Sequence, residues 1–146
     1  MDLFKTVDGV YQGSRPNNTK DLSQLDRAGI RTIISLDDRQ NLLEERYCAA
    51  NRVMLIIYPI DPTTTPRDEQ ISAVVNLLHS SNKPVLLHCY FGKDRTNLFM
   101  AAYLVSIGAM TLPQARAWMK SHGFPYGLNS FQANAWLVKL SNYLGA

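Results

Sequence analysis

Short apolar runs alternate along the chain with segments in which apolar residues recur at helical spacing. This alternation predicts an α/β domain with a central, mostly parallel sheet of about four to five strands flanked by helices. The uninterrupted apolar run over 53–58 is typical of a central strand. Strands are predicted over 10–12, which is the first strand of the chain, and over 31–36, 53–58 and 84–88. Helices are predicted over 19–28, 41–51, 94–107, 111–123 and 130–144. A further helix is predicted to begin at Pro66 and to place Ile71, Val74, Val75 and Leu78 on one face.

Several helix ends carry recognisable signals. Gly29 is in the stop position of the first helix. Thr65 is predicted to cap the third helix, with Pro66 in its first turn. Thr111 and Gln114 form a capping-box pattern. The 94–107 helix is apolar almost all round, so we expect it to lie in the core.

Length and composition narrow the class of protein. The 146 residues, 46% hydrophobic and 18% charged, predict one globular domain spanning residues 1–146. The net charge of +3 suits an anionic ligand but is too small and too dispersed for a nucleic-acid surface. The longest apolar stretch, 98–109, is too short to span a bilayer, and the N-terminus has no signal-peptide pattern. Two cysteines make no disulfide framework, which predicts a reducing, cytoplasmic location.

The most informative feature is a cysteine followed by five residues and an arginine, placed between a predicted strand and a predicted helix. Cys89 falls at the carboxyl end of the strand, where open α/β sheets place their ligands. The backbone of residues 90–95 can form an anion-binding nest, and the helix adds its positive N-terminal end. Arg95 supplies a planar fork that matches two phosphate oxygens. The pattern predicts a phosphate site with a thiolate nucleophile.

Three neighbours extend this site. Gly92 permits a tight backbone turn, Thr96 is placed to donate a hydroxyl hydrogen bond to the thiolate, and His88 is placed to brace the loop from beneath. The alternative is that Cys89 is simply a small buried residue, the common fate of a free cysteine. Coincidence is a poor explanation for His, Gly and Thr all at these positions.

The segment His88-Cys89-Tyr90-Phe91-Gly92-Lys93-Asp94-Arg95-Thr96 resembles the phosphate-binding loop of the protein tyrosine phosphatase superfamily. The chain as a whole resembles the compact, atypical dual-specificity phosphatase branch, through residues 10–16, 32–36 and 58–61 as well. The resemblance implies that fold, and a two-step hydrolysis of phosphate monoesters that needs neither metal nor cofactor. One departure is Asn97, where members of the family commonly have glycine, and it puts the loop geometry or the activity in question.

The family also places an aspartate on a loop before the catalytic strand, as the general acid. Asp61 follows a predicted strand, and its proline- and threonine-rich surroundings predict a loop. Asp68 is the rival, at about the third position of the next helix, where a carboxylate is favoured by the free N–H groups alone. We favour Asp61 as the acid, with a plain turn residue as its other interpretation.

Loop residues bear on the substrate. Lys93 matches a lysine found in lipid phosphatases of this superfamily, or else points to solvent. Asp94 either caps the helix or braces Arg95, and Tyr90 and Phe91 either line the pocket mouth or pack into the core. Arg15 and Arg39 fall in loops that the family brings near the active site, which makes them candidates for binding further phosphates. The expected partner is therefore a phosphorylated protein, or a phosphoinositide or inositol phosphate.

Other interpretations concern the second cysteine and other classes of protein. Cys48 is interpreted as a buried structural thiol, since the family position of a redox partner for the nucleophile corresponds to Asp37. His79 and His122 show no metal-ligand spacing, so no metal site is predicted. The competing class is a catalytically silent phosphate-binding module, with a rhodanese-type sulfurtransferase ranked third. The oligomeric state stays open.

Overall fold

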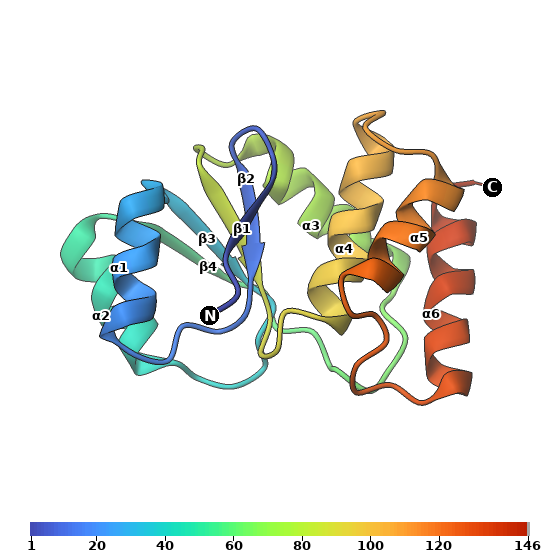
Figure 1. Cartoon of the computed structure of the whole chain (residues 1–146), viewed down its shortest axis with the longest axis horizontal. Coiled ribbons are helices and arrows are strands. Elements are labelled where there is room, and N and C mark those ends of the chain that lie inside the picture. The colour runs from blue at the N-terminus through green and yellow to red at the C-terminus, as the bar shows by residue number, and fades with distance from the viewer. Residues whose placement is uncertain (146) are drawn as a thin grey trace. The chain divides into compact units, whose positions relative to one another are not determined.

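The computed structural model describes residues 1–145 and divides the chain into two compact units. The first unit contains Met1–Ile60 and Ser80–Gly92. The second contains Asp61–His79 and the described residues from 93 onward. Each unit is thus built from two separate stretches of sequence, and Figure 1 labels the helices and strands of both.

The first unit carries a five-stranded sheet in the order β1-β2-β5-β3-β4. Strands β2, β5, β3 and β4 run parallel to one another, and β1 alone is antiparallel, paired with β2. The predicted mostly parallel sheet of an α/β fold is confirmed. The strands are β1 (Phe4–Val7), β2 (Val10–Gly13), β3 (Thr32–Ser35), β4 (Met54–Ile57) and β5 (Val85–His88).

Two helices, α1 (Thr19–Ala28) and α2 (Leu42–Asn51), pack on one face of this sheet. Strand register places one residue from each of four strands in a row across that face, because side chains alternate between the faces of a strand. Leu25 of α1 and Cys48 of α2 pack into the same apolar cluster as this row. The row consists of Tyr11, Leu86, Ile33 and Leu55.

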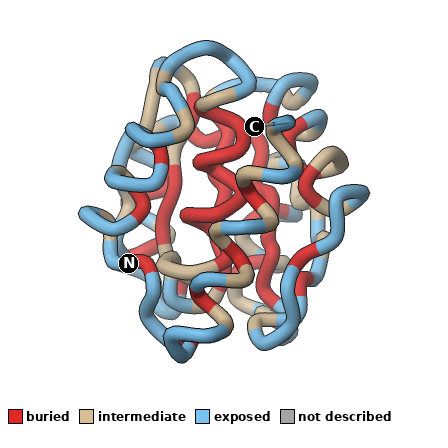
Figure 2. The backbone as a smooth tube through the Cα atoms, turned by 90° about the vertical axis from the view of Figure 1, so that its right-hand side faces the viewer, coloured by how far each residue is buried: buried red, intermediate tan, exposed pale blue. Residues whose placement is uncertain are grey.

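The second unit is helical and consists of α3 (Asp68–Ser80, whose last residue belongs to the first unit), α4 (Asp94–Ser106), α5 (Leu112–Ser121) and α6 (Ser130–Tyr143). Helix α4 contacts both α5 and α6. All ten residues from 95 to 104 are buried, and Figure 2 draws buried stretches in red. This burial confirms the prediction that the helix after Cys89 lies in the core.

Capping side chains fix several helix boundaries. Gly29 ends α1 in the left-handed conformation (φ 69°), as predicted. The capping box of Thr111 and Gln114 at the start of α5 is also confirmed. A second capping box, formed by Asn129 and Gln132, begins α6 and was not predicted.

Three predictions about elements are wrong. The strand predicted over 10–12 is present as β2, but it is not the first strand, because Phe4–Val7 precedes it as β1. Strand β1 shows no clear apolar alternation and pairs with β2 alone. The apolar run at 53–58 forms β4, which is an edge strand and not a central one. Met54 and Ile57 are 63% and 54% exposed there.

The third error concerns the start of α3. The first helical hydrogen bonds end on Arg67, whose carbonyl oxygen accepts from the backbone N–H groups of Gln70 and Ile71. The Gln70 side chain in turn accepts from the Arg67 N–H at 2.9 Å, so the cap lies two residues later than Thr65. Asp68 is consequently the first helical residue rather than the third.

Candidate active site

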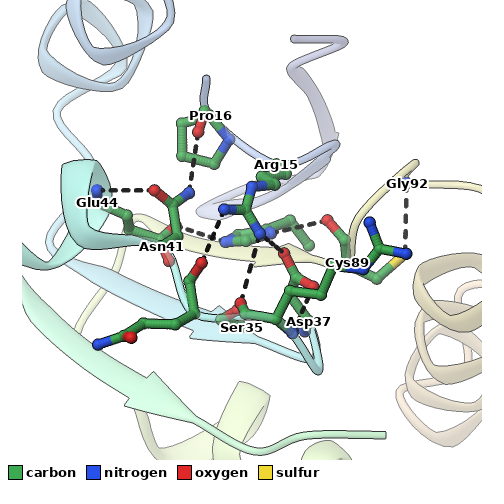
Figure 3. A network of polar contacts seen from close by, with 11 residues as sticks. Arg15, Pro16, Ser35, Asp37, Asn41, Glu44, Cys89 and Gly92 are labelled. Carbon is green, nitrogen blue, oxygen red and sulfur yellow. Dashed lines mark hydrogen bonds and ion pairs between the residues drawn. The ribbon is translucent and has the colours of Figure 1, made fainter. Parts of the chain in front are cut away.

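Cys89 directly follows β5, the strand at the middle of the sheet between β2 and β3. It lies at the carboxyl end of three adjacent parallel strands, the edge where such sheets bind ligands. The residue is buried, at 2% exposure, and its Sγ accepts a hydrogen bond from the Gly92 backbone N–H at 3.3 Å (Figure 3). A backbone amide of the loop therefore already points at the sulfur.

Gly92 makes this turn possible. Its φ is 75°, in the left-handed region that glycine adopts without strain. A Cβ atom added at this position would lie 2.7 Å from the carbonyl oxygen of Gly13, which is closer than real Cβ contacts. The loop therefore requires glycine here for two reasons, the left-handed backbone and the close approach of Gly13. The sequence predicted the tight turn but not the contact with Gly13.

His88 is buried at the end of β5 and joins the loop to α2. Its Nε2 lies 2.6 Å from Oε2 of Glu44, and its Nδ1 lies 3.0 Å from the carbonyl oxygen of Cys89. The carbonyl oxygen can only accept, so Nδ1 carries a proton, and a carboxylate at Glu44 favours a proton on Nε2 as well. Burial acts to lower the pKa of His88, but the hydrogen bond and charge of Glu44 outweigh it and leave the pKa raised.

Glu44 is the site residue that the sequence prediction missed. Its carboxylate is buried on α2, four residues before the buried Cys48. The signal that was available is a charged residue on the apolar face of a predicted helix, since buried carboxylates are almost always paired. Asn41 caps this helix by accepting from the Glu44 N–H and donates to the Pro16 carbonyl oxygen (Figure 3).

Two arginines from other loops of the first unit meet the side chain of Tyr90, the residue after Cys89. The guanidinium carbons of Arg15 and Arg39 lie 5.3 and 4.8 Å from the ring centroid, within cation–π range. The backbone N–H of Arg15 also donates to the Tyr90 carbonyl oxygen at 3.0 Å. Phe91 packs edge-on against Tyr90 and is 53% exposed, so neither aromatic residue enters the core.

Asp37 is buried and fixes Arg15 beside the loop. Its Oδ2 accepts from Nη1 of Arg15 at 2.8 Å (Figure 3). Cys48 shares α2 with Glu44, and burial followed by the charge of Glu44 raises its pKa to about 12. A thiol with that pKa is a poor nucleophile, which agrees with the prediction that Cys48 is structural.

Arg95 and Thr96 are buried in the first turn of α4, in the second unit. The Thr96 hydroxyl is enclosed and has no hydrogen-bond partner among residues 1–145. Burying a hydroxyl without a hydrogen-bond partner costs folding free energy, so a group that accepts a hydrogen bond from it would stabilise the site. The predicted hydrogen bond from Thr96 to the Cys89 thiolate stays a prediction.

The start of α4 is anchored to the segment between α5 and α6 by two side chains, those of Asp94 and Asn97. Asp94 accepts from the backbone N–H groups of Tyr126 and Gly127 at 2.7 and 2.8 Å. The Asn97 amide is fully buried and donates to the His122 carbonyl oxygen at 3.0 Å. Asp94 thus holds the segment between α5 and α6, and its predicted bracing of Arg95 stays a prediction. Asn97, the departure from the family pattern, has a structural function.

Lys93 also lies against this segment. A Cβ atom on Gly123 would be 2.8 Å from Cδ and 3.4 Å from Nζ of Lys93, so the lysine stem runs across Gly123. The Lys93 side chain is half-buried and does not extend fully into solvent. The absence of a side chain at Gly123 is what makes room for it.

Asp61 is exposed and begins the stretch that leads to α3. Its Oδ1 accepts from the Thr63 backbone N–H at 2.8 Å and from the Thr63 hydroxyl at 2.7 Å. These two hydrogen bonds, and to a smaller extent the charge of Arg95, hold the pKa of Asp61 below its usual value. Asp68, by contrast, pairs with Lys139 of α6 at 3.1 Å.

The structure shows no arrangement for a metal ion or a membrane helix within its described part. Among residues 1–145, no group of three or more histidine, cysteine, aspartate or glutamate side chains could hold a metal ion. In the same range, no helix combines the length and the apolar character that a bilayer crossing requires.

The fold is that of known phosphatases. The core catalytic domain of the PP-IP phosphatase SIW14 from S. cerevisiae superposes with a TM-score of 0.82 at 15% identity, covering 99% of this chain and 89% of that one. A strand, a Cys-x5-Arg loop and a helix on this fold define the class of cysteine-dependent phosphatases. Residues 8–138 match the family described as "PTP-SAK: Swiss Army Knife protein, DSP-PTPase phosphatase domain", and the chain belongs to that family.

Two relatives place the chain in the compact dual-specificity branch. The dual specificity protein phosphatase TpbA of Pseudomonas aeruginosa is 28% identical over 131 residues, covering 85% of this chain. The inositol diphosphatase DSP3 of Arabidopsis thaliana is 28% identical over 148 residues, covering 95% of this chain. The chain spans 56% of the length of the first relative and 66% of the second.

Proposed function

We propose that this chain hydrolyses phosphate monoesters through a cysteinyl-phosphate intermediate, with Cys89 as the nucleophile. The observation that carries the proposal is a buried sulfur at the carboxyl end of the middle strand, already facing the Gly92 amide. Oriented backbone amides favour negative charge on the sulfur and on a bound phosphate. Membership of the DSP-PTPase phosphatase domain family supports the same chemistry.

The reaction has two steps. The Cys89 thiolate attacks phosphorus in line, an S–P bond forms, and the bond to the leaving oxygen breaks while Asp61 gives that oxygen a proton. Water then attacks phosphorus, Asp61 takes its proton, and inorganic phosphate leaves with return of the thiolate. Arg95 and the amides of residues 90–95 bind the phosphate oxygens in both steps, and the Thr96 hydroxyl stabilises the departing thiolate.

Asp61 suits the role of general acid and base better than Asp68. The Asp61 carboxylate is exposed on a loop, and the Arg95 charge acts on it. The Asp68 carboxylate is occupied by Lys139 at the start of α3. The lowered pKa of Asp61 favours its role as base in the second step, and its role as acid requires the protonated minority at neutral pH.

The substrate is proposed to be either a phosphorylated protein or a phosphoinositide or inositol phosphate. The names of TpbA and DSP3 support one alternative each. Lys93 lies half-buried beside the α5–α6 segment, so its charge is held in place next to Asp94 and Arg95 in the chain. A fixed cation there favours substrates that carry more than one phosphate.

A fluorogenic phosphate-ester assay tests the function. We expect turnover that persists in excess chelator, a loss of at least about a thousandfold in Cys89→Ser, and a smaller loss in Asp61→Ala. Asp68→Ala serves as the matched control for Asp61→Ala and should retain the wild-type rate. Binding of phosphate without turnover would instead identify the chain as a silent phosphate-binding module.

A further inference from the structure

Strand β4 leaves one side of its backbone without a partner strand. Within residues 1–145 it pairs with β3 alone. The N–H groups of Met54 and Tyr58 donate to carbonyl oxygens on the β3 side at 3.0 and 2.8 Å. Because successive N–H groups of a strand point to opposite sides, those of Leu55 and Ile57 point away from β3, and so do their carbonyl oxygens. The edge therefore offers two donors and two acceptors to another extended segment.

The other edge strand, β1, is protected against such pairing, and β4 is not. Strand β1 carries Lys5 and an irregular register between Lys5 and Val7, two features that keep an edge strand from pairing with other chains. Strand β4 has the sequence Met-Leu-Ile-Ile, keeps a regular register with β3 and contains neither a charge nor a proline. Met54 and Ile57 are 63% and 54% exposed, one on each face of the strand. An unprotected apolar edge of this kind indicates a strand that binds a partner.

Two arginines without acidic partners lie at the beginning of this edge. Arg31 directly precedes β3 and Arg52 lies two residues before β4, and neither guanidinium group forms an ion pair or a hydrogen bond within residues 1–145. Both belong to the first unit and line a hollow of about 410 Å³ that reaches the first residues of β4. The residues that line it, none of them acidic, are Arg31, Arg52, Val53, Met54, Leu55 and Asn82.

One carboxylate lies near the arginines on their other side. An adjoining hollow of about 340 Å³ is lined by both arginines and by Asp26, which is exposed. Asp26 forms no ion pair with either of them in the described part of the chain. Two guanidinium groups against one screened carboxylate leave the beginning of the edge positively charged.

The backbone holds Arg52 in a conformation that arginine rarely adopts. Arg52 ends α2 at φ 56° and ψ 38°, and among residues 1–145 no other residue except glycine has a positive φ. Helices usually place glycine at this position, as α1 does with Gly29. An arginine here costs free energy that glycine would not. This cost is expected where the side chain has a function, such as binding a ligand at the hollow.

We propose that β4 binds an acidic peptide, which adds to the sheet as a further strand and pairs its carboxylates with Arg31 and Arg52. A second copy of this chain fits the edge less well, because residues 52–60 contain no carboxylate for the arginines of the other copy. The arginines lie at the amino ends of β3 and β4, whereas Cys89 follows the carboxyl end of the parallel strand β5. The peptide is therefore expected to bind without blocking the phosphate loop.

A matched pair of peptides and hydrogen exchange test the inference. The probe is a short peptide of alternating valine and threonine with two glutamates at each end, and its control carries lysines in place of the glutamates. We expect the acidic peptide to bind and the basic one not to bind. In the complex, the amide protons of Leu55 and Ile57 should exchange more slowly, whereas those of Met54 and Tyr58 are already bonded and should change little. Inorganic phosphate should not displace the peptide.

Arg52→Gly separates the charge from the fold. Glycine adopts the left-handed conformation without strain, so the variant should unfold at a temperature no lower than the wild type. Combined with Arg31→Ala, it should weaken binding of the acidic peptide about tenfold, because two exposed ion pairs are lost. Arg46→Ala is the matched control, since it removes an exposed arginine of α2 that lines neither hollow. It should change the affinity by less than about twofold.

Several results would overturn the proposal. These are an acidic peptide that does not bind, equal affinity for the acidic and basic peptides, and equal losses in Arg46→Ala and the double variant. Displacement by inorganic phosphate would place the peptide at the phosphate loop instead. A dimer in sedimentation measurements that itself protects the Leu55 and Ile57 amides would make a second copy the occupant of the edge.

Discussion

At the scale of single residues, His88 shows how the loop is supported from the sheet. One side of its ring faces Glu44 and the other faces the carbonyl oxygen of Cys89. The charged imidazole thereby fixes the backbone of Cys89 from a position that no solvent reaches. A buried ion pair of this kind is strongly destabilised when one partner is removed.

Replacing Glu44 by glutamine should therefore lower the free energy of unfolding by about 2 kcal/mol near pH 6. Because the folded pKa of His88 lies above the unfolded value of 6.5, the contribution of the charged pair is complete below pH 6.5. It declines as the pH rises through the folded pKa, so the difference between wild type and variant should shrink in alkaline solution. Urea unfolding across pH measures this, with Glu45→Gln as the control. A difference that is independent of pH would contradict the account.

The Thr63 hydroxyl tunes Asp61. In Thr63→Val the hydroxyl donor is lost while the backbone N–H remains, so the pKa of Asp61 should rise toward its ordinary value. A higher pKa keeps the general acid protonated to higher pH. The alkaline limb of kcat/KM, measured with a poor leaving group, should move upward in pH. Thr64→Val keeps both Thr63 bonds and should leave the limb in place; identical profiles for the two variants would remove Asp61 from the acid role.

At the scale of elements, α4 is the helix to which the loop is attached, and it is fixed to the α5–α6 segment through Asp94 and Asn97. The family pattern alone made Asn97 a possible defect. In the structure its side chain is buried and satisfies the carbonyl oxygen that follows α5. A glycine at this position would leave that oxygen without the amide donor.

Asn97→Gly should accordingly lower the free energy of unfolding by about 2 kcal/mol, roughly half from the lost hydrogen bond and half from glycine in a helix. Asn97→Ala separates the two contributions, because alanine removes the bond but keeps the helix propensity. We expect thermal unfolding to rank wild type above Asn97→Ala and Asn97→Gly lowest. A glycine variant as stable as wild type would mean that the bond to His122 contributes nothing.

Element prediction succeeded where the determining residues are adjacent in sequence. The Thr111 capping box and the largely apolar α4 were predicted because each signal is local. The position of β4 at the sheet edge was not predicted, because the crossover connections set the order of the strands. An apolar run has the same pattern in an edge strand as in a central one. The start of α3 depended on the Gln70 side chain reaching back to Arg67, a choice that Thr65 and Pro66 obscured.

At the scale of the whole chain, the site was predictable to the extent that its chemistry is contiguous. Nine consecutive residues identified the loop, and the glycine requirement at Gly92 follows from them in part. Glu44, Arg39 and Gly13 act on the loop from distant sequence positions. Their roles arise from strand register and loop contacts, which a single sequence does not reveal. The match of residues 8–138 to a phosphatase domain family gives the fold, and the contacts from distant positions come from the structure.

The central claim, that Cys89 forms a covalent bond to phosphorus, is tested most directly by trapping the intermediate. The wild-type protein is mixed with a phosphate ester, quenched rapidly in acid and digested, and the peptide containing Cys89 is examined by mass spectrometry. We expect a phosphoryl group on Cys89 in the wild type, more of it in Asp61→Ala with a good leaving group, and none in Cys89→Ser. Turnover that continues in Cys89→Ser, with no phosphorylated Cys89 in the wild type, would contradict the account.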